Sequence, residues 1–198
     1  MESLSDEPLV EEPAPVRTKR LHHLLIEWGL ILLAALLVSV GLRTFAFQTF
    51  FIPSGSMEPT LQIGDRIIVD KLSVDWGSIH RGDILVFKSP PTENCGGDPV
   101  VDLVKRVIGL PGDKLFSRGD TIYVNSKKLD ENWSHSEPLG NPIASESDPV
   151  VVQANHYFMM GDNHSDSCDS RMWGTITRSD IIGKAFFRVW PLNRVGFL

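Results

Sequence analysis

The sequence is short of cysteine and has no excess of positive charge, and each shortage excludes a class of protein. Only Cys95 and Cys168 carry a thiol among 198 residues, too few for a disulfide framework or a four-thiolate zinc site. The 19 Lys and Arg residues are outnumbered by 25 Asp and Glu, which excludes a nucleic-acid binder that relies on a basic surface. A single disulfide between these two cysteines is compatible with the sequence, which does not decide whether it forms.

The N-terminal segment lacks the composition needed to fold. Residues 1–16 carry five acids, three prolines and no base, so they bury too little apolar surface to fold alone. Arg17, Lys19 and Arg20 follow, and Trp28 to Leu42 then runs for 15 residues without a charge. We expect a flexible cytoplasmic tail over residues 1–23 and a transmembrane helix over residues 24–46, with residues 24–26 and the stretch from Phe45 supplying length that the uncharged run lacks.

The charges around this run set its expected orientation. Three bases precede it, whereas Arg43 is the only base between it and Arg66, so the positive-inside rule places the N-terminus in the cytoplasm and exports the remainder. The alternative is a cleaved secretory signal ending at Thr44-Phe45-Ala46. A core helix of a soluble protein would show a polar face, which this run lacks.

Residues 47–198 favour a mainly β domain. Short runs rich in β-branched and aromatic residues are separated by Gly, Pro, Asn and Asp. Asn125-Ser126 is expected to form a tight turn, and residues 130–149 a surface excursion. The expected strands are Arg66–Val69, Ile84–Phe87, Val100–Ile108, Thr121–Val124, Val150–Gln153, His156–Met160 and Ile181–Val189.

A proline-bounded bend follows the apolar run and presents two hydroxyls. Ser54 and Ser56 flank Gly55, between Pro53 and Pro59. The prolines fix φ, and the glycine permits close approach of a ligand. Such a bend can place a hydroxyl beside a free amide, although a linker turn would have the same composition.

A serine nucleophile needs a base to take its proton. The candidates are His80, His135, His156 and His164, or a lysine held in an apolar strand. Lys105 lies in such a run, where period 2 puts it on the face of Val101 and Leu103. Burial would lower its pKa toward the operating pH, so that activity rises from neutral to alkaline pH. An edge or snorkelling lysine is the structural alternative.

A third segment, Met160 to Arg171, is rich in Gly, Asp, Asn and Ser. It lacks the central glycine and terminal glutamate of a calcium loop. Asp169 and Arg171 can form a charged pair bracing the wall of a site. Ser167 can donate to a neutral lysine amine.

Together these segments resemble bacterial type I signal peptidase, a membrane-anchored serine protease. The resemblance covers the apolar run and nearly all of residues 47–198. Four motifs carry it in order: Ser-Gly-Ser-Met-x-Pro-Thr-Leu at 54–61, Arg-Gly-Asp-Ile at 81–84, Lys-Arg-Val-Ile-Gly-Leu-Pro-Gly-Asp at 105–113, and Gly-Asp-Asn at 161–163 continuing to Asp-Ser-Arg-x-Trp-Gly at 169–174.

The resemblance implies a role for each motif residue. Ser56 would be the nucleophile and Lys105 the general base, with Ser54 Oγ and the Ser56 N–H forming the oxyanion hole and Ser167 orienting Lys105. Asp169 and Arg171 would support the site. No metal or cofactor is implied. The residues expected to shape apolar pockets for small substrate side chains are Met57, Leu61 and Val104.

The implied fold is an antiparallel β-sheet catalytic domain of signal-peptidase type over residues 47–198. The implied activity is cleavage of signal peptides from exported preproteins after small-x-small sites, at the exported side of the plasma membrane. The partners would be those signal peptides, the lipid bilayer and the protein export machinery, with no nucleic acid.

The chain departs from the family pattern at His164, Ser165 and Asp166, where the loop usually reads Arg-Asp/Asn-Asn, so no role carries over to them. Two alternatives remain: an anchored extracellular adhesion module, suggested by Arg81-Gly-Asp83, and a Ser-Lys hydrolase of another substrate class.

Overall fold

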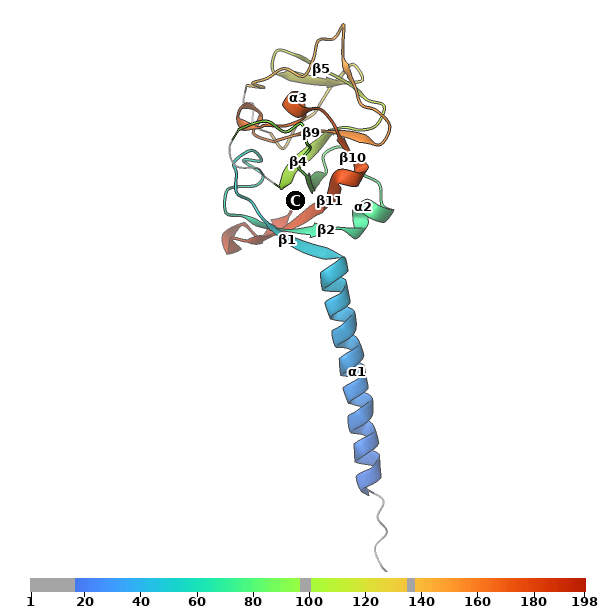
Figure 1. The fold of residues 1–198 in the computed structure, drawn as a ribbon. Helices are drawn as coiled ribbons and strands as arrows, with labels where there is room; N and C mark the ends of the chain where they lie inside the picture. Colours follow the sequence, from blue (N-terminus) through green and yellow to red (C-terminus); the bar gives the residue numbers. More distant parts are fainter. Residues whose placement is uncertain (1–16, 97–100, 135–137) are drawn as a thin grey trace, which may run out of the picture. The chain divides into compact units, whose positions relative to one another are not determined.

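The computed structural model describes residues 17–96, 101–134 and 138–198, and the expected tail over residues 1–16 lies outside them. The first element is α1 (Arg17–Phe45) (Figure 1). It begins seven residues before the expected Leu24, because residues 17–23 contain neither proline nor glycine to interrupt a helix. Residues 17–23 are therefore helical, not part of a tail.

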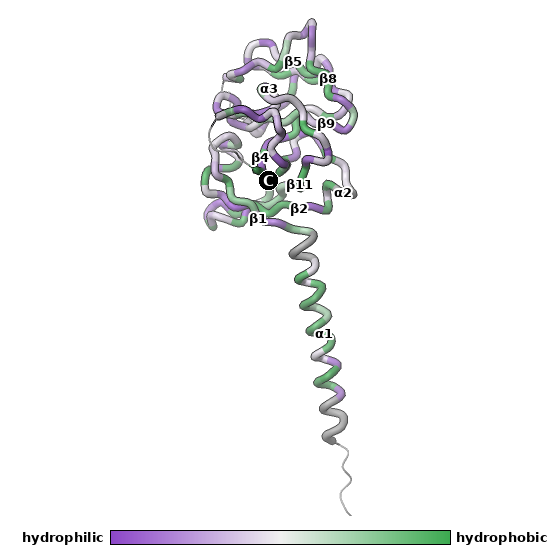
Figure 2. Tube along the Cα trace, in the orientation of Figure 1, coloured by the Kyte–Doolittle hydropathy of each residue, from purple (hydrophilic) through white to green (hydrophobic). Residues whose placement is uncertain are grey.

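The middle of α1 is apolar. Residues His23–Gly41 have a mean hydropathy of 2.3 and are long and apolar enough to cross a membrane, as the hydrophobic colouring in Figure 2 shows. The chain divides into two compact units between Leu42 and Arg43.

The second unit is built on an eight-stranded antiparallel sheet. Its order is β1-β2-β11-β3-β4-β9-β10, with β12 on β11. Two short helices, α2 (Leu72–Trp76) and α3 (Ser170–Trp173), lie in its connections. The strands are β1 (Phe47–Phe51), β2 (Arg66–Asp70), β3 (Ile84–Lys88), β4 (Asp102–Gly109), β9 (His156–Met160), β10 (Ile176–Thr177), β11 (Ile181–Trp190) and β12 (Gly196–Phe197).

A smaller four-stranded sheet has the order β7-β6-β5-β8. The turn predicted at Asn125-Ser126 joins β6 to β7, and both residues have positive φ, as a tight hairpin turn requires. Its strands are β5 (Lys114–Arg118), β6 (Thr121–Val124), β7 (Lys127–Lys128) and β8 (Val150–Val151).

The prediction of a mainly antiparallel β fold is confirmed. Every expected strand run contains a strand, although the run at 150–153 is reduced to the two residues of β8.

Two strands matter most for the site. β4 lies between β3 and β9, but β9 pairs only with Arg106 to Gly109. β1 pairs with β2 along one edge and with no other strand in the described part of the chain. The first half of β4 and the free edge of β1 therefore both have backbone groups available for another strand.

Candidate active site

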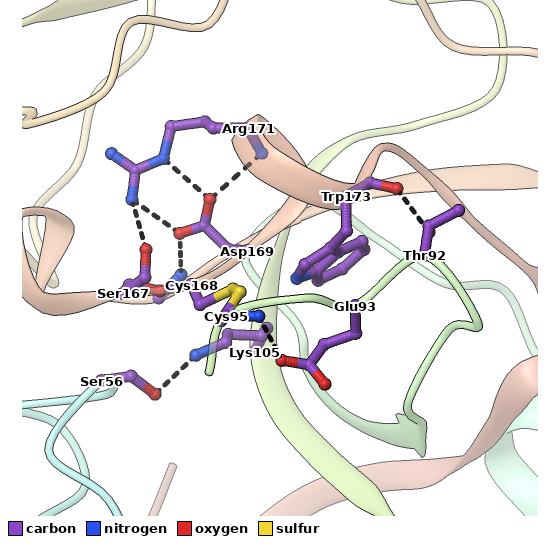
Figure 3. Close-up of a disulfide and its surroundings, with 11 residues drawn as sticks. Ser56, Thr92, Glu93, Cys95, Lys105, Ser167, Cys168, Asp169, Arg171 and Trp173 are labelled. Atoms are coloured by element: carbon purple, nitrogen blue, oxygen red, sulfur yellow. Dashed lines mark hydrogen bonds and ion pairs between the residues drawn. A yellow bond between two sulfur atoms is a disulfide. The ribbon is translucent and has the colours of Figure 1, made fainter. Parts of the chain in front are cut away.

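Ser56 and Lys105, 49 residues apart in sequence, meet in the fold. Lys105 Nζ lies 2.5 Å from Ser56 Oγ, as the dashed line in Figure 3 marks. Strand β4 carries the lysine, and the bend after β1 carries the serine. The lysine is 3% exposed and the serine 9%, so a weak nucleophile contacts an amine that is almost removed from water.

The surroundings of Lys105 favour its neutral form. Burial is the main cause that lowers the pKa of Lys105 from 10.5 to about 8. The negative charge of Asp169 opposes this change and the positive charge of Arg171 supports it, while Asp162 and Asp166 also raise the pKa. The amine therefore titrates near the pH at which a general base is most effective.

Hydrogen bonds to the 161–163 segment hold the bend around Ser56. The Asn163 N–H donates to the Ser56 carbonyl at 3.1 Å, and Asn163 Nδ2 donates to the Gly55 carbonyl at 3.3 Å. Ser54 Oγ lies 3.5 Å from Ser56 Oγ, so a second hydroxyl stands beside the candidate nucleophile.

Gly161 allows two parts of the site to approach each other. A Cβ at this position would overlap the Ser56 carbonyl oxygen and the Ser167 side chain. Ser167 Oγ is buried and makes no hydrogen bond to the described part of the chain. Glycine is required here because no larger residue fits between these groups, a constraint that the sequence analysis missed.

Asp169 and Arg171 form a buried ion pair behind the site. The Asp169 carboxylate accepts from Arg171 Nε and Nη2, each at 2.7 Å, and from the Gly161 N–H at 3.2 Å. It also caps α3 by accepting from the Arg171 N–H. Their side chains are 0% and 1% exposed, so the predicted charged pair is present and fixes the segment that carries Ser167 (Figure 3).

A second ion pair was missed by the sequence analysis. Arg106 Nε and Nη2 donate to the two Asp162 carboxylate oxygens at 2.8 and 2.6 Å, and Thr60 Oγ1 donates to Asp162 at 2.5 Å. This network ties the bend to β4. The sequence places Asp162 inside the Gly-Asp-Asn motif, but strand alternation does not predict that this residue pairs with Arg106.

A disulfide joins Cys95 to Cys168, with their Cα atoms 6.0 Å apart. Cys168 lies between Ser167 and Asp169, so the bridge ties the β3–β4 connection to the site (Figure 3). In the described residues, the cluster of metal-ligand type is Glu93 with these two cysteines, and both of its sulfurs belong to the bridge. The structure thus resolves the question that the sequence left open.

A cavity of about 230 Å³ adjoins Ser56 and Lys105. Met57 and Val104, two of the predicted pocket residues, line it, whereas Leu61 is fully buried in the core beside Met57. The pocket role of Leu61 stays a prediction. The other lining residues come from the end of β1 and its bend, Phe50, Phe51, Ile52, Pro53 and Ser54, and from β4, Asp102 and Leu103.

A serine hydroxyl in contact with a buried amine is the arrangement that a serine hydrolase with an amine base would need. Residues 25–190 match the family described as signal peptidase, peptidase S26. The chain belongs to this family, and it is accordingly a serine endopeptidase.

Two named relatives agree with this assignment. A protein of Synechocystis sp. described as probable signal peptidase I-2 is 39% identical over 193 residues, covering 97% of this chain and 85% of its own length. Signal peptidase I T of Bacillus subtilis is 34% identical, covering 86% of this chain and 88% of its own length. A signal peptidase I crystal structure from Enterococcus faecalis is 29% identical, with a TM-score of 0.42 over 54% of this chain and 96% of its own.

Proposed function

We propose that the protein cleaves signal peptides from exported preproteins after small-x-small sites with a Ser56-Lys105 dyad. The observation that carries the proposal is the 2.5 Å contact between Lys105 Nζ and Ser56 Oγ, made at a buried position where the amine pKa is lowered to about 8.

The neutral Lys105 amine accepts the Ser56 hydroxyl proton as Oγ attacks the scissile carbonyl carbon. Ser54 Oγ–H and the Ser56 N–H donate to the oxyanion that forms. The Lys105 ammonium then gives its proton to the leaving nitrogen, and the C–N bond breaks to leave an acyl-serine ester. Water, losing a proton to Lys105, attacks this ester. The lysine returns that proton to Ser56 Oγ as the acyl bond to Oγ breaks, and the released carboxylic acid loses its remaining proton to solvent and leaves as the carboxylate. Ser167 Oγ makes no hydrogen bond in the described part of the chain, so orienting the lysine amine would require this hydroxyl to turn toward Nζ.

The substrate would bind as an extended strand. The first half of β4 and the outer edge of β1 have unpaired backbone groups on the two sides of the cavity, and strand addition uses such groups for affinity. Alternate side chains would enter the cavity beside Met57 and Val104. The preference for small residues at both positions follows from the resemblance to the signal peptidase family.

The remaining parts of the proposal concern location. Residues 24–46 would span the plasma membrane once, with the N-terminus cytoplasmic and residues 47–198 on the exported side, as the charges around the span indicate. Lipid would surround the apolar surface of α1, and the export machinery would deliver preproteins to the site.

The test is incubation of the detergent-solubilised full chain with a precursor that carries Ala-x-Ala before its mature start. Discrete cleavage at that position is expected from the wild type and from neither Ser56→Ala nor Lys105→Met. Cleavage by Lys105→Met at the wild-type rate would overturn the dyad. Failure on precursors together with turnover of a small amide would indicate a hydrolase of another class.

The adhesion alternative is disfavoured by the contacts of its tripeptide. Arg81 Nη2 donates to Asp113 at 2.9 Å, and Asp83 pairs with Lys184 Nζ at 2.6 Å. The charged side chains of Arg81 and Asp83, which an adhesion partner would bind, are thus paired within the chain.

A further inference from the structure

Two arginines bind the backbone of the bend that carries Ser56. Arg188 belongs to β11, and Arg194 to the turn Leu192–Arg194. Arg188 Nη1 donates to the Thr60 carbonyl at 2.7 Å, while Arg194 Nη2 lies 3.3 Å from the same oxygen and 3.4 Å from the Pro59 carbonyl. Both arginines therefore hold the peptide groups that follow the nucleophile.

Arg188 and Arg194 share one buried carboxylate, so most of their hydrogen-bond donors need other acceptors. Asp65, whose side chain is 2% exposed, lies 3.1 Å from Arg194 Nη1 and 3.7 Å from Arg188 Nη1. One carboxylate thus serves two guanidinium groups. Burial and the charge of Arg194 lower the pKa of Arg188. The other guanidinium donors bind backbone carbonyls: Arg188 Nε donates to the Arg194 carbonyl, and the remaining contacts are those to Pro59 and Thr60.

Thr60 connects these arginines to the rest of the site. Its carbonyl faces the arginines, and its hydroxyl donates to Asp162 at 2.5 Å. The Leu61 N–H donates to the Met57 carbonyl at 2.8 Å, closing a turn directly after Ser56. A displacement of Thr60 is therefore passed to the nucleophile through a hydrogen-bonded turn.

We propose that Arg188 and Arg194 are positioning residues that hold Ser56 Oγ against Lys105 Nζ by fixing the Pro59 and Thr60 carbonyls. This inference rests on the proposed function of the dyad. Arg194 lies beyond residues 25–190, the part of the chain that matches the family. Burial and the charges of Asp169, Arg171, Asp162 and Asp166 shift the pKa of Lys105, and neither arginine is among these charges, so removing either one should affect the position of the nucleophile more than the titration of the base.

The test compares Arg194→Ala and Arg194→Lys with Arg178→Ala in the full chain, using the precursor assay above. Arg178 is the matched control because its Nη2 also binds two carbonyls, those of Val74 and Gly77 at 2.5 and 2.9 Å, away from the bend. Loss of positioning predicts that kcat falls about tenfold or more in Arg194→Ala. KM should stay within about twofold, and the pH at which the rate rises should not move. Arg194→Lys retains the charge and one donor, and should recover part of kcat.

Thermal melting of each variant separates positioning from stability. Arg178→Ala should lower Tm and keep the kcat of the folded enzyme. The proposal is overturned if folded Arg194→Ala retains kcat within about twofold, or if Arg178→Ala lowers kcat equally. If Arg194→Ala does not fold, the same criterion applies to Arg194→Lys. An inactive wild type would contradict the proposed function itself.

Discussion

The proposed role of Lys105 as a base depends on its position in the sheet. An exposed lysine keeps its proton at neutral pH and cannot act as a base. In strand β4 the same side chain is 3% exposed and contacts Ser56. Burial disfavours the ammonium form and so makes the neutral amine available. The pH dependence of the enzyme should show this effect.

The rate of precursor cleavage should rise with pH. With the pKa of Lys105 near 8, the neutral fraction grows from about one tenth at pH 7 to about nine tenths at pH 9, so kcat/KM should increase about tenfold. Initial rates across this range give the profile. A flat profile with chemistry rate-limiting would contradict an amine base.

Asp166→Asn provides a directional check on the same residue. The Asp166 charge raises the pKa of Lys105, because it stabilises the ammonium form. Removing that charge should move the rise in cleavage rate to lower pH. A rise displaced to higher pH would be inconsistent with this assignment.

Gly161 should tolerate no side chain. In Gly161→Ala the new methyl group would overlap the Ser56 carbonyl and the Ser167 side chain, displacing both from Lys105. We expect kcat to fall about a hundredfold, measured in the precursor assay. Gly196→Ala is the matched control, since a Cβ there meets nothing within 4 Å. Equal activity of the two variants would refute the requirement.

At the scale of elements, alternation and turn residues predicted much of the fold. Apolar runs located β2, β3, β4, β6, β9 and β11, because strands that bury a face must repeat apolar residues. The same pattern gave no notice of β1, β5, β10 and β12. β10 and β12 are two residues long, so they are too short to show alternation. β1 follows directly from an apolar helix, so no boundary in the sequence marks its start.

The site was predictable where motifs carry it and not where packing does. The resemblance located Ser56, Lys105, Asp169 and Arg171, and the fold brings these residues together. The Arg106–Asp162 pair, the close approach at Gly161 and the pairing of Cys95 with Cys168 depend on neighbours brought together from separate elements. No local pattern encodes such contacts, since side-chain period constrains only one strand at a time.

The disulfide should stabilise the element that carries Ser167 and Asp169. The bridge closes a loop of 73 residues, and removing it as Cys95→Ser/Cys168→Ser should cost roughly 2–4 kcal/mol of unfolding free energy. Melting with and without reductant measures this. The reduced wild type should approach the double variant, and the double variant should not respond to reductant. A wild type that melts unchanged after complete reduction would contradict the prediction.

At the scale of the whole molecule, the proposed anchor has a simple signature. With residues 24–46 spanning the bilayer, the chain should stay in membranes through alkaline carbonate extraction. Protease added to the exported face of sealed vesicles should digest residues 47–198, whereas protease on the cytoplasmic face should reach only the N-terminal segment. Release into the supernatant, or digestion from the cytoplasmic face, would overturn the topology.

With α1 in the bilayer as proposed, the short connection after it would limit which bonds the enzyme can reach. The helix ends at Phe45, and Ser56 follows 11 residues later along the chain, a span of at most about 40 Å when fully extended. If α1 anchors the chain as proposed, the candidate active site would be restricted to bonds near the bilayer surface. Under that proposal, an Ala-x-Ala sequence in a distant loop of a secreted protein would lie out of reach, so the length of the connection would contribute to selectivity alongside the pocket.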